Sequence, residues 1–328
     1  MMERALPEEV VEIARDIKDM RIRGAGRIAR AAARALSMAV EKYSGDDLED
    51  FRRYIGFVAE YLVKTRPTAV SLPNAVSFVV NPFFKARDLK SVQEARRMLL
   101  ERASAFIKYS EDALERIAEI GSRLVQDGDN ILTHCNSEAV ASIIRRAIRE
   151  GKNIKVFATE TRPLYQGHIT ARMLLDAGAD ITLIPDSSIR SIIRRIDKVI
   201  VGADTVTANG AVVNKIGTSL IALIAHERRT DFYVATETYK FSPYTVWGEP
   251  VVIEERAPTE VASQEFLDKH PKLKILNPSF DVTPSSYITG IITEIGLIPP
   301  NAALLVLEEV YGREAGHEPI QGLDEGEV

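Results

Sequence analysis

Cysteine and long hydrophobic runs are what this sequence most lacks. Its 328 residues contain one cysteine, Cys135, so no disulfide can form within the chain. A single cysteine fits a reducing cytosol, and we expect a cytoplasmic protein. No stretch reaches the roughly 18 uninterrupted apolar residues that a transmembrane helix needs. The first residues alternate charged and apolar side chains without the core of a signal peptide, so we expect no membrane partner.

The sequence also lacks an excess of charge of either sign. Its 42 Lys and Arg face 47 Asp and Glu, a net charge of −5, which argues against nucleic acid as a partner. Hydrophobic residues make up 45% and charged residues 27%, which is typical of a globular chain and excludes disorder. The 5 histidines show no ligand spacing and no CxxC pair is present, so the sequence predicts no metal site.

The spacing of apolar residues changes near residue 128. Before this point apolar residues recur every three or four positions over 7–20, 27–43, 46–65 and 91–125, which predicts an antiparallel bundle of four or five helices. After it, short β-branched runs alternate with helical stretches. Runs that are apolar on both faces predict a parallel sheet covered on both sides. We therefore predict an α/β fold with a helical domain over 1–127 and a doubly wound, mostly parallel, Rossmann-like catalytic domain over 128–328.

Five reactive or ionisable side chains close the predicted strands. They are Cys135, Glu160, Asp186, Asp204 and Glu237. In an open parallel sheet, ligands bind beyond the carboxyl ends of the strands. Each side chain alone has a plain structural explanation, but together they define a pocket at one edge of the sheet.

Cys135 ends a predicted strand and is followed by Asn136 and Ser137, which are good N-cap residues for the next helix. The plainer interpretation is that a lone cysteine is a small core residue. Beside a helix N-terminus, however, the helix dipole favours the thiolate, which predicts a lowered pKa. His134 precedes Cys135, but neighbours on a strand point to opposite faces, so we expect no direct Cys–His dyad.

Asp204 ends the apolar run DKVIVGAD and precedes a segment rich in Gly, Asn and Thr, residues 205–218. The plainer interpretation of Asp204 is a carboxylate that caps a turn. The following segment carries Lys215 just before a predicted helix. A loop of small residues with a lysine at a helix entrance predicts a phosphate cradle, although it is not a P-loop because GxxxxGK[ST] is absent.

Two helix entrances in the predicted helical domain carry an arginine. Arg23 and the Gly24-Ala25-Gly26 segment open an alanine-rich helix, whose free N–H groups could bind an anion. A flexible helix start is the plainer interpretation, and a dinucleotide fingerprint is excluded because no strand precedes the glycines. Arg66 stands before the second entrance, Arg66-Pro67-Thr68-Ala69.

Four motifs follow one another with the order and spacing of a single protein family. They are THCN at 133–136, ETRP at 160–163, GAD at 202–204 and NGAVVNKIGT at 209–218. RGAG at 23–26 and TRPTAV at 65–70 are similar to motifs of the family's helical domain. Over nearly its whole length the chain resembles this family of methylthioribose-1-phosphate isomerases, archaeal ribose-1,5-bisphosphate isomerases and the alpha, beta and delta subunits of translation initiation factor 2B.

Within this family the resemblance favours an enzyme. The initiation-factor subunits generally lack the cysteine and the aspartate that stand here as Cys135 and Asp204. Methylthioribose-1-phosphate isomerases usually read THCNTG, whereas this chain reads THCNSEAV. Lys240 follows a predicted strand and suits a second phosphate better than a methylthio group. The chain resembles most the isomerases that convert ribose 1,5-bisphosphate to ribulose 1,5-bisphosphate in archaeal AMP degradation. A methylthioribose-1-phosphate isomerase and a non-catalytic nucleotide-sensing subunit remain the alternatives.

The resemblance implies acid–base catalysis by two groups without a metal or redox cofactor. Asp204 would give a proton to the ring oxygen, and Cys135 as thiolate would remove the proton from C2. Desolvation by the apolar strand Val199–Val201 is expected to raise the pKa of Asp204 for this role. A hydride shift from C2 to C1 is the open alternative.

The resemblance also implies the binding residues and the partners. The phosphates and sugar hydroxyls would be held by Arg23, Gly24, Ala25, Gly26, Arg66, Ser137, Glu138, Ala139, Asn214, Lys215 and Lys240. The expected partners are a phosphorylated sugar, a nucleotide activator such as AMP, and further copies of the chain in a dimer or in a hexamer built as a trimer of dimers.

Overall fold

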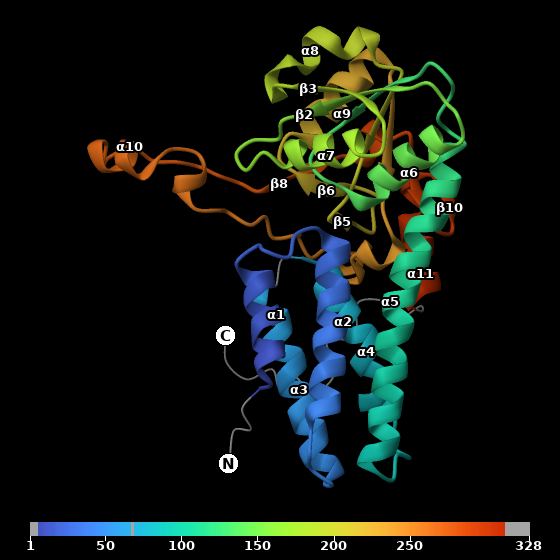
Figure 1. The fold of residues 1–328 in the computed structure, drawn as a ribbon, viewed down its shortest axis with the longest axis vertical. Coiled ribbons are helices and arrows are strands. Elements are labelled where there is room, and N and C mark those ends of the chain that lie inside the picture. The colour runs from blue at the N-terminus through green and yellow to red at the C-terminus, as the bar shows by residue number, and fades with distance from the viewer. Residues whose placement is uncertain (1–5, 67–68, 312–328) are drawn as a thin grey trace. The chain divides into compact units, whose positions relative to one another are not determined.

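A computed structural model describes residues 6–66 and 69–311 (Figure 1). These residues form two compact units, one reaching to Asp112 and the other beginning at Ala113. The division falls within one long helix and so lies before residue 128, the point at which the sequence pattern changes. A domain boundary at residue 128 therefore stays a prediction. Pro67, Thr68 and His317 lie outside the described residues.

The first unit is helical, as the apolar spacing predicts. Its helices are α1 (Glu8–Lys18), α2 (Ala25–Lys42), α3 (Leu48–Thr65), α4 (Ser71–Lys85) and the first part of α5 (Val92–Ser122). α2 packs against α1, α3 and α4. Its buried face is mainly alanine, and such small side chains let neighbouring helices approach closely. The Asp47 side chain caps α3 by accepting from the Asp50 N–H at 2.7 Å.

The second unit contains a seven-stranded sheet in the order β10-β9-β7-β4-β1-β2-β3. All its strands pair in parallel except β10, which is antiparallel to β9, so the predicted mostly parallel sheet is confirmed. The strands are β1 (Asn130–Thr133), β2 (Lys155–Thr159), β3 (Asp180–Ile184), β4 (Lys198–Val201), β7 (Asp231–Ala235), β9 (Gly290–Thr293) and β10 (Gly296–Ile298).

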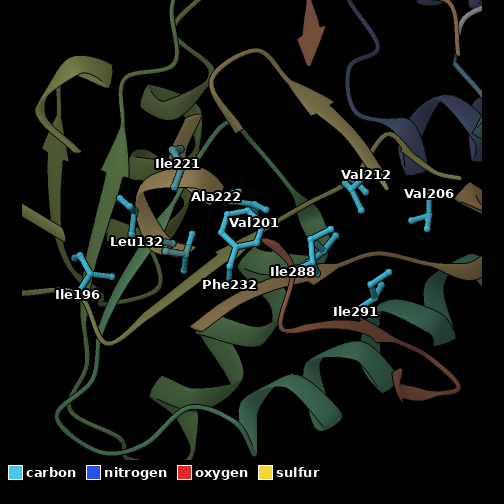
Figure 2. Packing of buried hydrophobic residues seen from close by; sticks show 14 of the residues in the cluster. Leu132, Ile196, Val201, Val206, Val212, Ile221, Ala222, Phe232, Ile288 and Ile291 are labelled. Carbon is cyan, nitrogen blue, oxygen red and sulfur yellow. The ribbon is translucent and has the colours of Figure 1, made fainter. Parts of the chain in front are cut away.

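Helices cover both faces of this sheet, which is therefore doubly wound. On one face, β-strand side chains pack with α8 (Ile189–Ile192), α9 (Thr218–Arg228) and α11 (Ala303–Tyr311); Figure 2 shows part of this core, with Leu132, Ile221 and Phe232 among its members. On the other face, the end of α5, α6 (Glu138–Arg149) and α7 (Gln166–Leu175) cover Ile131, Val156 and Ile200. Adjacent residues such as Ile131 and Leu132 thus enter different cores, which explains why the strands are apolar on both faces.

The strand order contains a topological switch point between β1 and β4. The chain builds outward from β1 to β2 and β3, then returns to place β4 on the other side of β1. Leu132 pairs with Val199 across this junction. In open α/β sheets the crevice beyond such a junction is where ligands bind.

The sequence pattern missed a second sheet. Residues 205–218, which we expected to form a loop, contain strands β5 (Thr205–Val206) and β6 (Val212–Lys215), and β6 also pairs with β8 (Phe280–Thr283). β5 has only two residues, which is too short for an alternating pattern to appear. Residues between β7 and β8 include α10 (Gln264–Lys269) and extend away from the sheet (Figure 1). No helix in the described part of the chain is long and apolar enough to cross a bilayer.

Candidate active site

Cys135 lies just beyond β1, two residues before Ser137, the N-cap of α6. Its backbone is left-handed, with φ of 66°. Its N–H donates to Thr161 Oγ1 at 2.9 Å, and its carbonyl accepts from the Thr170 hydroxyl at 2.7 Å. A left-handed non-glycine residue costs about 1–2 kcal/mol, so the surrounding structure must hold it there. The residue as a whole is partly exposed, but its thiol group is buried.

The expectation of a lowered pKa at Cys135 is wrong for the ligand-free chain. Burial raises the pKa of the thiol to about 11, and the charges of Asp204 and Asp186 also raise it. The charge of Lys215 and a backbone hydrogen bond from Asn136 lower it, but not enough to offset burial. The helix dipole does not prevail because α6 begins only at Glu138. Cys135 is therefore a thiol at rest.

Asp204 follows β4, on the other side of the switch point from Cys135. A Cβ atom at Gly202 would lie 2.6 Å from Ser137 Oγ, so only glycine lets the end of β4 pack against the start of α6. The Asp204 N–H donates to the Val213 carbonyl at 3.0 Å, and its side chain is partly exposed. Cys135 and Asp204 thus flank the junction, as the prediction of a shared pocket requires.

Lys215 is buried at the end of β6. Its exposed fraction is 8%, its Nζ lies 4.9 Å from the centre of the Phe280 ring, and its charge acts on the Cys135 thiol. No carboxylate among the described residues forms an ion pair with it. A buried cation without an anionic partner is unfavourable, so this position suits a ligand phosphate.

The phosphate cradle predicted at the start of α9 is already occupied. Asp281 on β8 accepts from the Gly217 N–H at 2.7 Å and from the Ser219 N–H at 3.0 Å. Burial raises the pKa of Asp281 to about 6, although both hydrogen bonds lower it. Asn214, also predicted as a binding residue, is buried and donates to Thr218 Oγ1 at 3.0 Å. The turn after Lys215 is therefore capped by the protein's own carboxylate.

Lys240 ends a short 3-10 helix, Thr238–Lys240, beyond β7. It is buried, with 6% of its surface exposed, and its Nζ lies 2.6 Å from Oε2 of buried Glu237. The backbone beside it meets β5, because the Ser242 N–H donates to the Val206 carbonyl at 2.8 Å. The loop that carries Lys240 thus lies next to the strand that follows Asp204.

Asp186 and Glu160, the other two residues predicted at strand ends, make hydrogen bonds within the protein. Both oxygens of Asp186 accept backbone N–H groups, from Thr161 at 2.8 Å and from Arg162 at 2.7 Å. The Glu160 N–H donates to the Ile184 carbonyl at 2.8 Å, and its side chain is partly exposed. Glu138 and Ala139 open α6 beside the Ser137 cap.

Arg23, Gly24, Ala25, Gly26 and Arg66 all lie in the helical unit. Gly24 is the N-cap of α2 with φ of 90°, so the predicted helix start is confirmed. The Arg23 side chain donates to the Met20 carbonyl at 2.5 Å. Arg66 directly follows α3. Their role in phosphate binding stays a prediction.

Sequence reasoning missed Gln166, the first residue of α7. A Cβ atom at Gly167 would lie 1.7 Å from the Thr159 carbonyl oxygen, so α7 begins directly against the carboxyl end of β2. Gln166 is buried there, and its Oε1 has no hydrogen-bond partner in the described part of the chain. The glutamine–glycine pair just after a strand was the signal that could have identified it as a candidate ligand contact.

The chain matches the Initiation factor 2 subunit family over residues 21–300. It belongs to that family. It is 52% identical over 305 residues to the ribose 1,5-bisphosphate isomerase of Methanocaldococcus jannaschii, a match that covers 92% of this chain and 96% of the relative. The methylthioribose-1-phosphate isomerase of Acetivibrio thermocellus is 40% identical over 88% of each chain.

A solved structure of the same family has the same fold. The translation initiation factor eIF-2B from Pyrococcus horikoshii superposes with a TM-score of 0.78 at 37% identity, and the match covers 91% of this chain and all of that one. Three ribose 1,5-bisphosphate isomerases are 47–52% identical to the chain, and the chain is an isomerase.

Proposed function

We propose that this isomerase converts ribose 1,5-bisphosphate to ribulose 1,5-bisphosphate in nucleoside monophosphate degradation, with Asp204 as acid and Cys135 as base. The observation that carries the proposal is the placement of these two side chains on either side of the switch point, with the buried charge of Lys215 acting on the same thiol. The 52% identity to the ribose 1,5-bisphosphate isomerase of Methanocaldococcus jannaschii, against 40% to the methylthioribose-1-phosphate isomerase of Acetivibrio thermocellus, supports the choice of substrate.

The reaction needs ring opening before isomerisation. The anomeric oxygen carries a phosphate, so a free aldehyde cannot form while that ester remains. Protonated Asp204 gives its proton to the ring oxygen as the bond from that oxygen to C1 breaks. The Cys135 thiolate then removes the proton from C2, which leaves an enol phosphate. That proton returns to C1, and the hydroxyl proton at C2 returns to the Asp204 carboxylate, so both groups are restored.

The resting state of Cys135 determines how this pair begins the reaction. Because burial raises the pKa of Cys135 to about 11, sulfur holds a proton in the ligand-free chain. We propose that one proton is shared by the pair and moves from sulfur to the Asp204 carboxylate when substrate binds. A proton that moves within the pair needs no proton from solvent.

The proposed phosphate contacts are those that the family resemblance implies. Lys215, Asn214 and the Ser137–Ala139 segment lie around the strand ends, and Lys240 lies in the loop beyond β7. Arg23, Gly24, Ala25, Gly26 and Arg66 stay predicted phosphate contacts. Activation by a nucleotide such as AMP stays a prediction, which is tested by adding AMP to the assay.

A coupled assay that compares ribose 1,5-bisphosphate with methylthioribose 1-phosphate tests the proposal. We expect kcat/KM to be at least about tenfold higher for the bisphosphate, the effect of one charge-assisted contact. Deuterium from solvent should appear at C1 of the product wherever the Cys135 thiol exchanges its proton with solvent before it protonates C1, whereas a hydride shift would carry no solvent proton to that carbon. Equal rates for both substrates, or no turnover of the bisphosphate, would contradict the proposed function.

We also propose that the chain forms a homo-oligomer through α9 and β8. α9 exposes Leu220 (53%) and Leu223 (39%), and the neighbouring strand β8 exposes Val282 (47%). Apolar side chains gathered on adjoining elements are typical of a protein interface. Changing Leu220 and Leu223 to Glu should lower the mass measured by light scattering. Leu175→Glu, at an exposed position on α7, is the matched control and should leave the mass unchanged.

A further inference from the structure

His134 is a buried group for which the proposed reaction has no role. It precedes Cys135, and its ring makes two hydrogen bonds on opposite sides. Nδ1 lies 2.5 Å from Thr159 Oγ1, and Nε2 lies 2.8 Å from the Ile216 carbonyl oxygen. A Cβ atom at Gly217 would come within 3.2 Å of the same ring, so the turn after Lys215 packs directly on His134.

The direction of each hydrogen bond follows from the partners. A carbonyl oxygen only accepts, so Nε2 carries a proton and donates to Ile216. Burial lowers the pKa of His134, only partly offset by that hydrogen bond and the charge of Asp186, so the ring is neutral and Nδ1 accepts from the Thr159 hydroxyl. Thr159 Oγ1 then accepts from the Thr161 hydroxyl at 3.1 Å, and Thr161 Oγ1 accepts from the Cys135 N–H.

These bonds form one continuous chain from Cys135 to the turn after Lys215. Every hydroxyl in it both donates and accepts, and bonds aligned in this way polarise and strengthen one another. At one end this series of hydrogen bonds holds the left-handed backbone of Cys135. At the other end it fixes Ile216, which adjoins Lys215, the cation that acts on the Cys135 thiol.

We infer that His134 is a positioning residue that keeps Cys135 and Lys215 in their reactive arrangement through Thr159 and Thr161. It touches no substrate atom and transfers no proton. Its contribution is geometric, because a misplaced base loses rate even when its chemistry is intact. The expected loss of rate rests on the proposed function. The expected change in the burial and reactivity of the Cys135 thiol does not.

The single cysteine allows a test that does not depend on turnover. In His134→Phe the ring is kept in size but loses both hydrogen bonds, so Cys135 should relax and become less buried. Iodoacetamide should then label it about tenfold faster at neutral pH, the effect of lowering a thiol pKa by one unit. Thr161→Val should have the same effect by a different break in the chain. Thr161→Ser keeps the hydroxyl and should label at the wild-type rate.

The kinetic readout separates positioning from simple destabilisation. We expect kcat to fall about ten- to a hundredfold in His134→Phe and Thr161→Val, as for a misplaced catalytic group, with KM little changed. The buried variant Ile292→Val on β9 lies outside the chain of hydrogen bonds and serves as the control for lost stability. It should keep wild-type labelling and kcat.

Unchanged labelling in both His134→Phe and Thr161→Val would overturn the inference, whatever the activity. Faster labelling that Ile292→Val reproduces at equal loss of stability would also overturn it, because it would report general loosening. If the wild-type chain does not turn over ribose 1,5-bisphosphate, the proposed function fails, while the labelling comparison still decides the role of His134.

Discussion

One buried lysine, Lys215, ends β6 and another, Lys240, lies in the loop beyond β7, but the two lysines differ in how their charge is balanced. Lys240 forms a close ion pair with Glu237, and both side chains are buried. Lys215 has the face of Phe280 beside it and no ion-pair partner in the described residues. Of the two lysines, only Lys215 contributes to the pKa of the Cys135 thiol.

This difference changes which lysine is best prepared for a phosphate. A paired lysine must give up or share its carboxylate before it binds an anion, whereas an unpaired buried lysine gains a partner by binding one. The sequence argument placed the weight on Lys240, because it could not show that Glu237 lies within reach. Under the proposed function, Lys215 is therefore the better prepared lysine, whereas Lys240 would have to release Glu237 before it could bind a phosphate.

The largest expected effect concerns the two proposed catalytic groups, Cys135 and Asp204, on which the comparison of the lysines depends. Cys135→Ala and Asp204→Asn should each lower kcat by about three orders of magnitude or more, because each removes one member of an acid–base pair. Substrate binding, measured by calorimetry, should survive in both. Turnover above about a tenth of wild type in either variant would contradict the roles of Cys135 as base and Asp204 as acid. The comparison of Lys215 with Lys240 as contacts of one active site would then lose its basis.

The reactivity of Cys135 should sharpen the comparison directly. With its pKa raised to about 11, the wild-type thiol should react with iodoacetamide about a hundredfold more slowly than a model thiol at neutral pH, since two units separate the two pKa values. Lys215→Met should slow labelling further, because it removes the charge that lowers this pKa. Lys240→Met should leave the rate unchanged, and substrate should protect the thiol in all three proteins. Equal effects of the two substitutions would contradict the difference between the lysines.

The two lysines should also differ in substrate kinetics. Lys215→Met should lower kcat/KM for ribose 1,5-bisphosphate about ten- to a hundredfold, because a charge-assisted phosphate contact is lost. Lys240→Met should lower it by less. If Lys240 binds the second phosphate, its loss should spare a sugar 1-phosphate that lacks the 5-phosphate, whereas a purely structural lysine would affect both substrates equally.

The two substitutions should affect the free energy of unfolding in the opposite order, with the larger loss in Lys240→Met. Lys240→Met leaves Glu237 buried without its partner and should cost about 3–5 kcal/mol of unfolding free energy, measured by urea titration. Adding Glu237→Gln should recover part of that loss. Lys215→Met removes an unpaired charge and should be nearly neutral or stabilising.

The last expected effect concerns the carboxylate that caps the turn after Lys215. Burial raises the pKa of Asp281 from 3.8 to about 6, so the folded chain binds its proton more tightly than the unfolded chain does. The free energy of unfolding of the wild type should therefore fall, relative to Asp281→Asn, as pH rises from about 4 to about 6. A difference that stays constant over this range, in urea titrations at several pH values, would show that Asp281 is not held in this way.

The main sheet could be predicted from the sequence because its strands are signalled locally. Runs such as 154–160 and 197–204 are apolar on both faces, and this pattern exists only where helices cover a parallel sheet on both sides. The placement of Cys135 and Asp204 at one edge followed from the same rule. Residues 205–206 and 296–298 were missed because strands of two or three residues carry too few residues to show a period.

The state of the site could not be predicted, because it depends on contacts between distant parts of the chain. The hydrogen bonds of Asp281 to the turn at Gly217, and the burial that raises the pKa of Cys135, exist only once the fold is formed. The ion pair of Lys240 with Glu237 is local in sequence, but its burial is not. A helix entrance in a sequence thus indicates where an anion could bind, but not whether the protein already fills that place.

The protonated state of Cys135 has a consequence for the chemical durability of the enzyme. Peroxide attacks thiolates, and a sulfenic acid is usually rescued by a second thiol. This chain has no second cysteine, so an oxidised Cys135 could not be resolved within it and would be exposed to irreversible over-oxidation. A pKa of about 11 keeps the resting sulfur in its unreactive form, which means that the burial that delays its role as a base also protects the enzyme between turnovers.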